Sequence, residues 1–134
     1  MQPNTHLGIN QALCGVPVKL SPGAAQVALQ TTPEMAADEQ GLVHGGFVFG
    51  AADYAAMLAV NDPFVVLGAA ECRFLAPVRA GEVVDILANV LESKGKKRVV
   101  ETTASVADRP VFTATFTTFA LESHVLSATC ANRD

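Results

Sequence analysis

The sequence has few aromatic and few charged residues. Of its 134 residues, 6% are aromatic, none is Trp, one is Tyr, and 16% are charged. The formal net charge is −4, which argues against nucleic acid as the main partner because that role requires a basic surface. Half of the residues are hydrophobic. This composition is apolar for a small monomer and favours an oligomer with buried interfaces.

The sequence also lacks a membrane-spanning segment and a cysteine motif. No apolar run reaches the roughly 18 residues of a membrane span without meeting Asp53 or a Gly pair. Residues 1–10 lack the basic and apolar regions of a signal peptide. The three cysteines, Cys14, Cys72 and Cys130, are widely spaced and form no CxxC motif. Reduced thiols in a cytoplasmic protein are the simplest interpretation.

Hydrophobic patterns predict a single domain over residues 1–134. A short helix is expected at about 5–13, capped by Asn4 or Thr5 and stopped by Gly15. A long helix is expected at about 44–60, where the residues are hydrophobic all round, so that it is buried on every side. The remaining expectations are strands at 16–20, 24–31, 64–75, 82–92, 97–107 and 111–121, turns at 21–23 and 108–110, and a frayed tail at about 123–134.

This order of elements predicts an α+β fold in which an antiparallel sheet wraps around one long central helix. The sheet can cover only one side of a helix that is apolar all round. No second long helix is expected in the chain. The simplest cover for the other side is therefore a symmetry mate, which again predicts at least a dimer.

Residues 41–57 carry the pattern that points to chemistry. Gly45 and Gly46 stand at the start of the long helix, where the first N–H groups lack intrahelical partners and carry partial positive charge. Asp53 lies near the middle of the helix among apolar residues, where a carboxylate is costly to bury without a partner or a task. The segment thus offers an oxyanion-binding amide and a general base. The alternatives are an ordinary glycine-containing helix start and a structural Asp at a dimer interface.

The spacing of these two groups predicts a site shared between subunits. Gly45 and Asp53 lie about 12 Å apart along a continuous helix. A donor and a base that act on one carbonyl must each come within roughly 3 Å of the reacting atoms. We therefore expect Gly45 of one subunit to act with Asp53 of another, which gives two equivalent sites in a two-fold dimer.

The chain resembles the hotdog-fold acyl-CoA thioesterases, and among them the phenylacetate-pathway type. The resemblance covers roughly residues 5–121. It rests on His44-Gly45-Gly46, on Asp53 nine residues after the His, and on Phe74-Leu75-Ala76-Pro77-Val78-x-x-Gly81. It implies a hotdog fold and hydrolysis of an acyl-CoA thioester to a free acid and coenzyme A. Gly45 would polarise the carbonyl with its N–H, and Asp53 would be the base or the nucleophile.

No metal or cofactor is expected besides coenzyme A as part of the substrate, because the sequence shows no ligand cluster of His, Cys and carboxylates. The expected partners are the acyl-CoA substrate and a second copy of the chain, with a dimer of dimers left open. The acyl group cannot be predicted, because the residues of its pocket are distant in the sequence.

Residues around the helix start are further candidates for substrate binding. His44 and Gly46 belong to the turn, and we interpret His44 as structural or supporting because the helix dipole disfavours a cation there. Related thioesterases often have Asn or Gln where this chain has Asp38. An ionised Asp can only accept hydrogen bonds. Either Gln40 supplies the second donor to the carbonyl, or Gly45 acts with less help, or turnover is slow.

A basic cluster and two histidines complete the candidates. Lys94, Lys96, Lys97 and Arg98 surround Gly95 and form either a solvated hairpin turn or a contact for the phosphates of coenzyme A. Arg73 and Arg79 are alternatives for that contact. His6 and His124 lie near the two ends of the chain and are expected to carry no chemistry.

The alternative function is a non-catalytic acyl-CoA-binding module that acts as a sensor or regulatory subunit. Asp38 in place of a donor favours it, and so does the strand after the long helix. Leu67, Gly68 and Ala69 stand there where the family has a Ser or Thr that orients a water. A hydratase or dehydratase is disfavoured, because the sequence contains neither Gly-His-Phe-Pro nor Asp-x-Asn-Pro-x-His.

Overall fold

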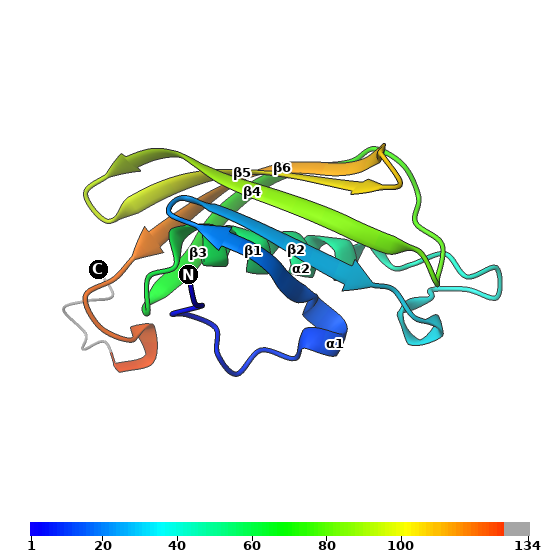
Figure 1. The fold of residues 1–134 in the computed structure, drawn as a ribbon, viewed down its shortest axis with the longest axis horizontal. Coiled ribbons are helices and arrows are strands. Elements are labelled where there is room, and N and C mark those ends of the chain that lie inside the picture. Colours follow the sequence, from blue (N-terminus) through cyan, green and yellow to red (C-terminus); the bar gives the residue numbers. More distant parts are fainter. Residues whose placement is uncertain (128–134) are drawn as a thin grey trace.

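The computed structural model describes residues 1–127. Within them, six antiparallel strands form one sheet in the order β1-β2-β4-β5-β6-β3, and the long helix α2 lies against one of its faces (Figure 1). This is the predicted hotdog arrangement. The strands are β1 Val16–Ser21, β2 Ala24–Gln30, β3 Val65–Phe74, β4 Val83–Lys94, β5 Lys97–Val106 and β6 Arg109–Ala120. The helices are α1 Gln11–Cys14 and α2 Gly45–Val60, with 3-10 turns at Pro33–Met35 and Val125–Ser127.

Helix α2 forms the centre of the core, as predicted. It begins after His44 and ends at Asn61, whose φ of 53° puts the C-cap in the left-handed region. Its buried residues pack mainly against β2, β4 and β5. Small side chains let the sheet approach the helix closely, and Ala51, Ala55 and Ala56 have no exposed surface.

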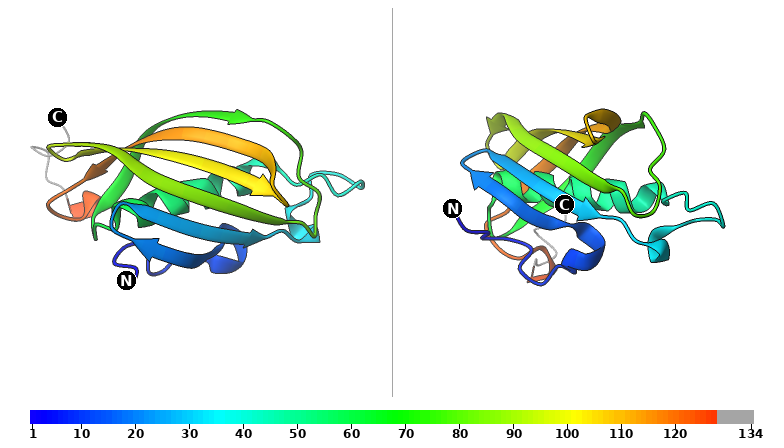
Figure 2. Two further views of the ribbon diagram at one scale, coloured as in Figure 1. Left: turned by 45° about the horizontal axis from the view of Figure 1, so that its top comes forward. Right: turned by 45° about the vertical axis from the view of Figure 1, so that its right-hand side comes forward.

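One side of α2 is covered by the chain itself. The segment that precedes β1 passes along the side of α2 that faces away from the central strands (Figures 1 and 2). Asn61 attaches this segment to the end of α2, because its side chain accepts from Asn4 N–H at 2.7 Å and donates to Gln2 O at 3.0 Å. The cover that we expected from a symmetry mate is therefore supplied in part by residues 1–15.

A narrow side of α2 stays uncovered within the protomer. Gly46, Gly50 and Asp53 lie on one face of the helix, since they are spaced by four and three residues. Gly46 is exposed, and the other two are only half-buried. A Cβ atom added at Gly50 would meet no atom within 4 Å. We call these three residues the open stripe.

The N-terminal helix is shorter than predicted, and it begins later. Instead of 5–13, α1 covers Gln11–Cys14, and its cap is Asn10, whose side chain accepts from Ala12 N–H at 3.0 Å. His6 has a φ of 54°, and Ile9 N–H donates to His6 O at 3.2 Å, so a turn replaces the first part of the expected helix.

The turn between β5 and β6 also differs from the prediction at 108–110. Ala107 and Asp108 form it, with φ values of 47° and 68°. Positive φ at both central residues is typical of a type I′ hairpin, so Arg109 and Pro110 belong to β6. The predicted tail at 123–134 begins with the 3-10 turn Val125–Ser127. Its remaining part, 128–134 with Cys130, lies outside the described residues.

Two glycines are required by the backbone of the sheet. Gly23 has a φ of 77° in the tight turn between β1 and β2, as the predicted turn at 21–23 requires. The register of β3 against β6 shifts between Leu67 and Ala69. At this bulge a Cβ on Gly68 would collide with the ring of Phe119, so only glycine lets the ring lie there.

Candidate functional site

The N-terminus of α2 presents backbone donors that have no acceptor. The loop before it is held firmly, because Val43 N–H donates to Val78 O at 2.8 Å and His44 N–H donates to Met35 O at 2.9 Å. Phe47 N–H donates to His44 O at 3.1 Å. No acceptor bonds to the N–H groups of Gly45 and Gly46 within residues 1–127. Such paired amides at a helix start are suited to bind an oxyanion or a polarised carbonyl.

Side chains lie close to both glycines. A Cβ on Gly45 would lie 3.0 Å from Cε1 of Phe74, and one on Gly46 would lie 2.8 Å from Nε2 of His44. His44 is exposed and makes no capping bond with its side chain. Its ring packs edge-on against Phe47, with centroids 6.1 Å apart. His44 therefore lies over the helix start, and its supporting role stays a prediction.

An apolar cavity of about 320 Å³ opens beside Gly45. We call it the Gly45 cavity. It lies between the start of α2 and the segment that follows β3, so the Phe74-Leu75-Ala76-Pro77-Val78 pattern forms one of its walls. Its lining is Leu42, Val43, Gly45, Val48, Phe74, Leu75, Ala76, Pro77, Val78 and Val111. The donor at Gly45 thus borders a space suited to an apolar chain.

Asp53 is a half-buried carboxylate whose Oδ1 is fully buried and bonds to no group of the described chain. Burial raises the pKa of this carboxyl from the ordinary value of 3.8 to about 6. The charge on Asp53 also contributes, after burial, to the raised pKa of the Cys14 thiol. A carboxylate whose pKa lies close to neutrality, without a structural partner, is suited to take up a proton during a reaction.

Asp53 borders a second cavity, of about 370 Å³, which we call the Asp53 cavity. Three parts of the chain form it together with α2: the N-terminal segment, the start of β3 and the segment after β6. Its lining is Thr5, His6, Asp53, Met57, Pro63, Phe64, Val65, Val66, Leu67, His124 and Val125. The Gly45 and Asp53 cavities have no lining residue in common. One protomer therefore does not bring Gly45 and Asp53 to a common space, and the shared site remains a prediction.

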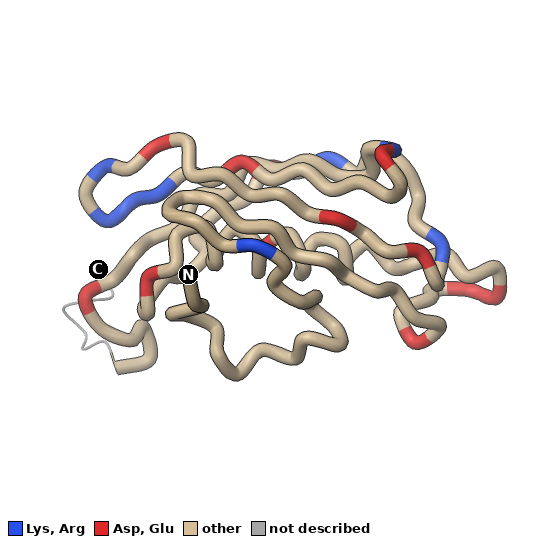
Figure 3. The backbone as a smooth tube through the Cα atoms, in the orientation of Figure 1, with Lys and Arg blue, Asp and Glu red and all other residues tan. Residues whose placement is uncertain are grey.

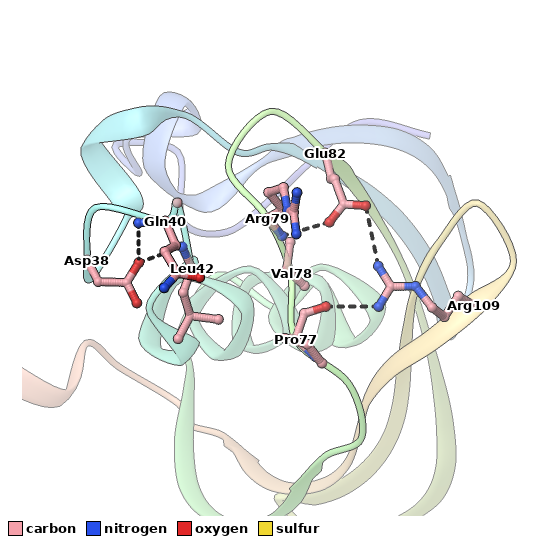
Figure 4. A pocket seen from close by; sticks show the side chains of 9 residues that line it. Asp38, Gln40, Leu42, Pro77, Val78, Arg79, Glu82 and Arg109 are labelled. Carbon is pink, nitrogen blue, oxygen red and sulfur yellow. Dashed lines mark hydrogen bonds and ion pairs between the residues drawn. The ribbon is translucent and has the colours of Figure 1, made fainter.

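Asp38 holds its own loop together. Its Oδ1 accepts from Gln40 N–H at 3.0 Å and from Leu42 N–H at 3.2 Å (Figure 4). These bonds fix the loop before Gly45, and they use the carboxylate as an acceptor, as predicted for an ionised Asp. Asp38 and Gln40 also line a cavity of about 360 Å³ that is adjacent to the Gly45 cavity through Leu42, Pro77 and Val78.

Two arginines line this third cavity. Arg109 donates to Pro77 O at 2.9 Å and pairs with Glu82 at 3.3 Å, while Arg79 donates with its backbone N–H to Glu82 at 2.6 Å (Figure 4). Arg109 is thus fixed by the chain. Arg79, the alternative phosphate contact, lines this cavity together with Gln40 and the loop before Gly45.

The predicted basic cluster lies at the β4–β5 hairpin, at the opposite end of the protomer from the loop before Gly45 (Figure 3). Arg98 donates to Gly95 O at 2.6 Å and to Lys97 O at 3.0 Å, so its side chain braces the turn. Lys96 and Lys97 are exposed. Arg73 of β3 lies opposite Thr113 of β6 in the strand register. Its neighbour Phe74 points toward Gly45, so the side chain of Arg73 lies on the other face of the sheet. The structure therefore does not bring Arg73 to the site.

Three residues at the Asp53 cavity were missed or set aside by the sequence analysis. His6 and His124 were expected to carry no chemistry, yet both line this cavity, and Thr5 lies beside them. No local pattern marks them. Thr5 and His6 follow a segment that Asn61 holds from far away in the sequence, and His124 meets them only in the folded chain. A His next to a buried Thr near the N-terminus gives no periodic signal.

Among residues 1–127, no group of three or more His, Cys, Asp or Glu side chains is arranged to hold a metal ion. Cys14 and Cys72 are free thiols. None of the helices in this part of the chain is long and apolar enough to cross a membrane.

Comparison with known protein families gives one clear match. The family described as acyl-CoA thioesterase N-terminal domain matches residues 32–119. Methylthioribose-1-phosphate isomerase from Aquifex aeolicus is 52% identical over 118 residues, which are 88% of this chain and 26% of that protein. Transcription factor FapR from Caldanaerobacter subterraneus is 26% identical over 97 residues, which are 72% of this chain and 48% of that protein. This chain thus spans less than half of the length of either relative.

Solved structures share the fold over most of the chain. The uncharacterized protein PH1136 from Pyrococcus horikoshii has a TM-score of 0.93 and 47% identity, over 94% of this chain and 97% of that one. Cj0977, a sigma28-regulated virulence protein from Campylobacter jejuni, has a TM-score of 0.90 and 32% identity, over 92% and 88%. A Streptococcus mutans protein bound to acetyl CoA has a TM-score of 0.73, with 21% identity over 81% and 89% of the two chains.

Proposed function

This chain belongs to the hotdog-fold acyl-CoA thioesterase family, and we propose that it hydrolyses an acyl-CoA thioester to a free carboxylic acid and coenzyme A. The observation that carries this proposal is Asp53, a carboxylate with a buried, unpartnered oxygen and a pKa raised to about 6. It lies on the helix whose first two amides have no acceptor in the described chain. These are the two groups that ester-type hydrolysis needs: a base for water and a donor for the carbonyl oxygen.

In the proposed reaction, the N–H of Gly45 polarises the thioester carbonyl and Asp53 activates a water or attacks the carbonyl carbon directly. The Gly45 cavity accepts the apolar part of the substrate next to the carbonyl. The C–S bond then breaks, and coenzyme A leaves as the thiol.

We propose that each site combines Gly45 of one subunit with Asp53 of another. Two observations support this arrangement. The two residues border separate cavities in one protomer, and the open stripe with the adjacent edge strand β3 leaves room for a second copy. Strand β3 is exposed over most of its length. An open edge of that kind readily pairs with another chain. A second copy that covers the open stripe would bring a helix N-terminus toward Asp53.

The basic hairpin fits the same arrangement. Within one protomer, the basic β4–β5 hairpin lies at the end of the molecule opposite the loop before α2 (Figures 1 and 3). If two α2 helices run antiparallel, the hairpin of one subunit lies at the same end as Gly45 of the partner subunit. The phosphates of coenzyme A would then meet exposed lysines near the carbonyl donor.

A complementation experiment tests the proposal. Asp53→Asn removes the base, and Gly45→Pro removes the donor N–H. Proline suits this first helical position, and His44 before it has a ψ of 129°, within the range of a residue before proline. Each variant alone is expected to be inactive. Co-refolded in equal amounts, they should recover up to roughly a quarter of wild-type activity, because about half of the dimers are mixed and each has one intact site of two.

Gly45→Ala serves as the matched control, because it adds the crowding side chain and keeps the N–H. Its activity separates the loss of the donor from the contact with Phe74. No recovery from folded dimers shown to be mixed would refute the shared site. A release assay for the thiol over a panel of acyl-CoA substrates would refute hydrolysis altogether if no substrate were cleaved.

The second candidate is an acyl-CoA-binding module without turnover. It is favoured by Asp38, which accepts two loop N–H bonds and cannot donate to the carbonyl while ionised. The similarity to a transcription factor over 72% of the chain points in the same direction. Calorimetric binding of acyl-CoA by both wild type and Asp53→Asn, with no thiol released by either, would establish this alternative.

A further inference from the structure

Asp53 lines the Asp53 cavity, and its Oδ1 is the only buried carboxylate oxygen of the described chain that has no hydrogen-bond partner. Its Oδ1 needs a donor when it is ionised, and the residues of β3 that line the cavity, Val65, Val66 and Leu67, have none in their side chains. The following residues Gly68 and Ala69 offer no polar side chain either. A water bound by Asp53 therefore needs a second polar contact from another part of the chain.

His6 lies in this cavity, and the structure holds it there. Asn61 fixes the backbone of residues 2–4 to the end of α2 through its two side-chain bonds. Thr5 follows with 3% of its surface exposed. His6 has a φ of 54°, an uncommon conformation for a residue other than glycine. Its carbonyl accepts from Ile9 N–H at 3.2 Å, which closes the turn.

The His6 ring is also oriented by its neighbours. Its Nδ1 forms a hydrogen bond with Oγ1 of Thr5 at 2.8 Å, and its centroid lies 6.5 Å from that of Tyr54. The bond at Nδ1 leaves Nε2 as the ring nitrogen without a partner in the described chain. In either neutral tautomer, Nε2 can make one hydrogen bond to a water, as donor or as acceptor.

Burial lowers the pKa of the His6 imidazole, so the ring is neutral at pH 7. Asp53, whose pKa burial raises to about 6, is mainly ionised at the same pH. Cys14 is near Asp53 and is a neutral thiol, because burial and Asp53 raise its pKa. His124 is the other imidazole of the cavity, but it is exposed, and its Nδ1 accepts from Leu126 N–H at 3.0 Å.

We propose that His6 is a further catalytic residue, which binds the hydrolytic water from one side while Asp53 binds it from the other. This inference rests on the proposed thioesterase function. The oxygen of the water attacks the thioester carbon, and one proton passes to the Asp53 carboxylate. The tetrahedral intermediate then expels the thiolate of coenzyme A, which takes up the proton from Asp53. His6 keeps the water in place and exchanges no net proton. His6 thus supplies the polar contact to the water that the side chains of β3 lack. It belongs to residues 1–31, which lie outside the family match.

The test compares three variants of the full-length chain with the wild type. His6→Ala should lower kcat by about 10- to 100-fold, the cost of a misplaced reactant, and change KM by less than about twofold. His6→Gln should keep more activity than His6→Ala, since its amide group can reach the same water. Thr5→Val should lower kcat less than His6→Ala, because it removes the hydrogen bond that orients the His6 ring but keeps the ring itself. Leu7→Ala is the control, because Leu7 is the next residue and its side chain is 77% exposed.

The kcat measured with added imidazole distinguishes a catalytic role of His6 from a merely structural one. Imidazole should restore part of the kcat of His6→Ala but should not increase the activity of Leu7→Ala or Asp53→Asn. In the double variant His6→Ala with Asp53→Asn, kcat should be no lower than in Asp53→Asn alone, because both residues act on one water. Thermal melting of each variant checks that it is folded.

The possible failures are distinct. If the wild type cleaves acyl-CoA and folded His6→Ala has the same kcat, the role of His6 is refuted and the thioesterase proposal stands. If His124→Ala loses activity and His6→Ala does not, the wrong imidazole was assigned. If the wild type cleaves no acyl-CoA, the thioesterase proposal falls, and the role of His6 falls with it.

Discussion

Replacing Asp53 by Asn should stabilise the folded protein at neutral pH, although it removes the proposed base. The folded carboxyl has a pKa of about 6, against an ordinary value of 3.8. One pKa unit corresponds to about 1.4 kcal/mol, so the ionised side chain costs the folded state about 3 kcal/mol above pH 6. Asn has nearly the same shape and carries no charge, so this cost is absent in the variant.

The sign of the pH dependence follows from the direction of the pKa shift. A carboxyl whose folded pKa is raised does not destabilise the protein below about pH 4, where it is protonated in both states. Between pH 4 and 6 the unfolded chain releases this proton more readily, so the free energy of unfolding of the wild type falls as the pH rises. The stability difference between Asp53→Asn and the wild type should therefore widen by roughly 1 to 1.5 kcal/mol between pH 5 and 7.5.

Urea denaturation at a fixed protomer concentration measures this difference, because subunit association makes stability depend on concentration. Tyr54 is the single Tyr of a chain without Trp, and 3% of its surface is exposed, so its fluorescence reports unfolding close to Asp53. A difference that does not change with pH would refute the raised pKa. A variant less stable than the wild type at pH 7 would show that the carboxylate has a stabilising partner in the assembly.

Two further predictions follow from the same residues. The kcat of the wild type should rise about tenfold between pH 5 and 7, as the ionised fraction of Asp53 rises from about a tenth to about nine-tenths; a flat profile of steady-state rates would contradict its role as the base. Gly50→Ala should stabilise the protomer, because Ala favours a helix over Gly by roughly 0.5–1 kcal/mol and the added methyl has nothing within 4 Å. It should nevertheless weaken the dimer in light scattering if a second copy covers the open stripe, and unchanged association would place the subunit contact elsewhere.

Helix α2 could be predicted because its signal is local. The apolar stretch has a turn before it and Asn61-Asp62-Pro63 after it, so the sequence itself marks both ends. Its first turn contains the Gly pair, and the structure confirms that the helix begins at Gly45. The strands could be predicted for the same reason, since alternating apolar residues and turn residues are neighbours in the sequence.

The N-terminal segment could not be predicted, because its conformation depends on distant bonds. Asn61 satisfies backbone groups of Asn4 and Gln2 across more than fifty residues. The chain then turns at His6, whose φ of 54° does not fit the helix expected at 5–13. The turn at Ala107 and Asp108 was misplaced for a different reason. Asp-Arg-Pro is a turn-like tripeptide, whereas the type I′ geometry here uses two residues that are not glycine.

The N-terminal segment lies beside Asp53, where burial sets the pKa of the proposed base. A fully solvated Asp would have a pKa near 4 and would be a weak base at neutral pH, whereas a completely buried one would stay protonated. Thr5 and His6 on one side and Pro63–Leu67 on the other leave Asp53 half-buried, with a pKa of about 6. A general base works best when its pKa lies just below the working pH, where it is ionised yet still basic. The N-terminal segment, which lies outside the family match, thus lines the cavity beside the proposed base, whose burial raises its pKa.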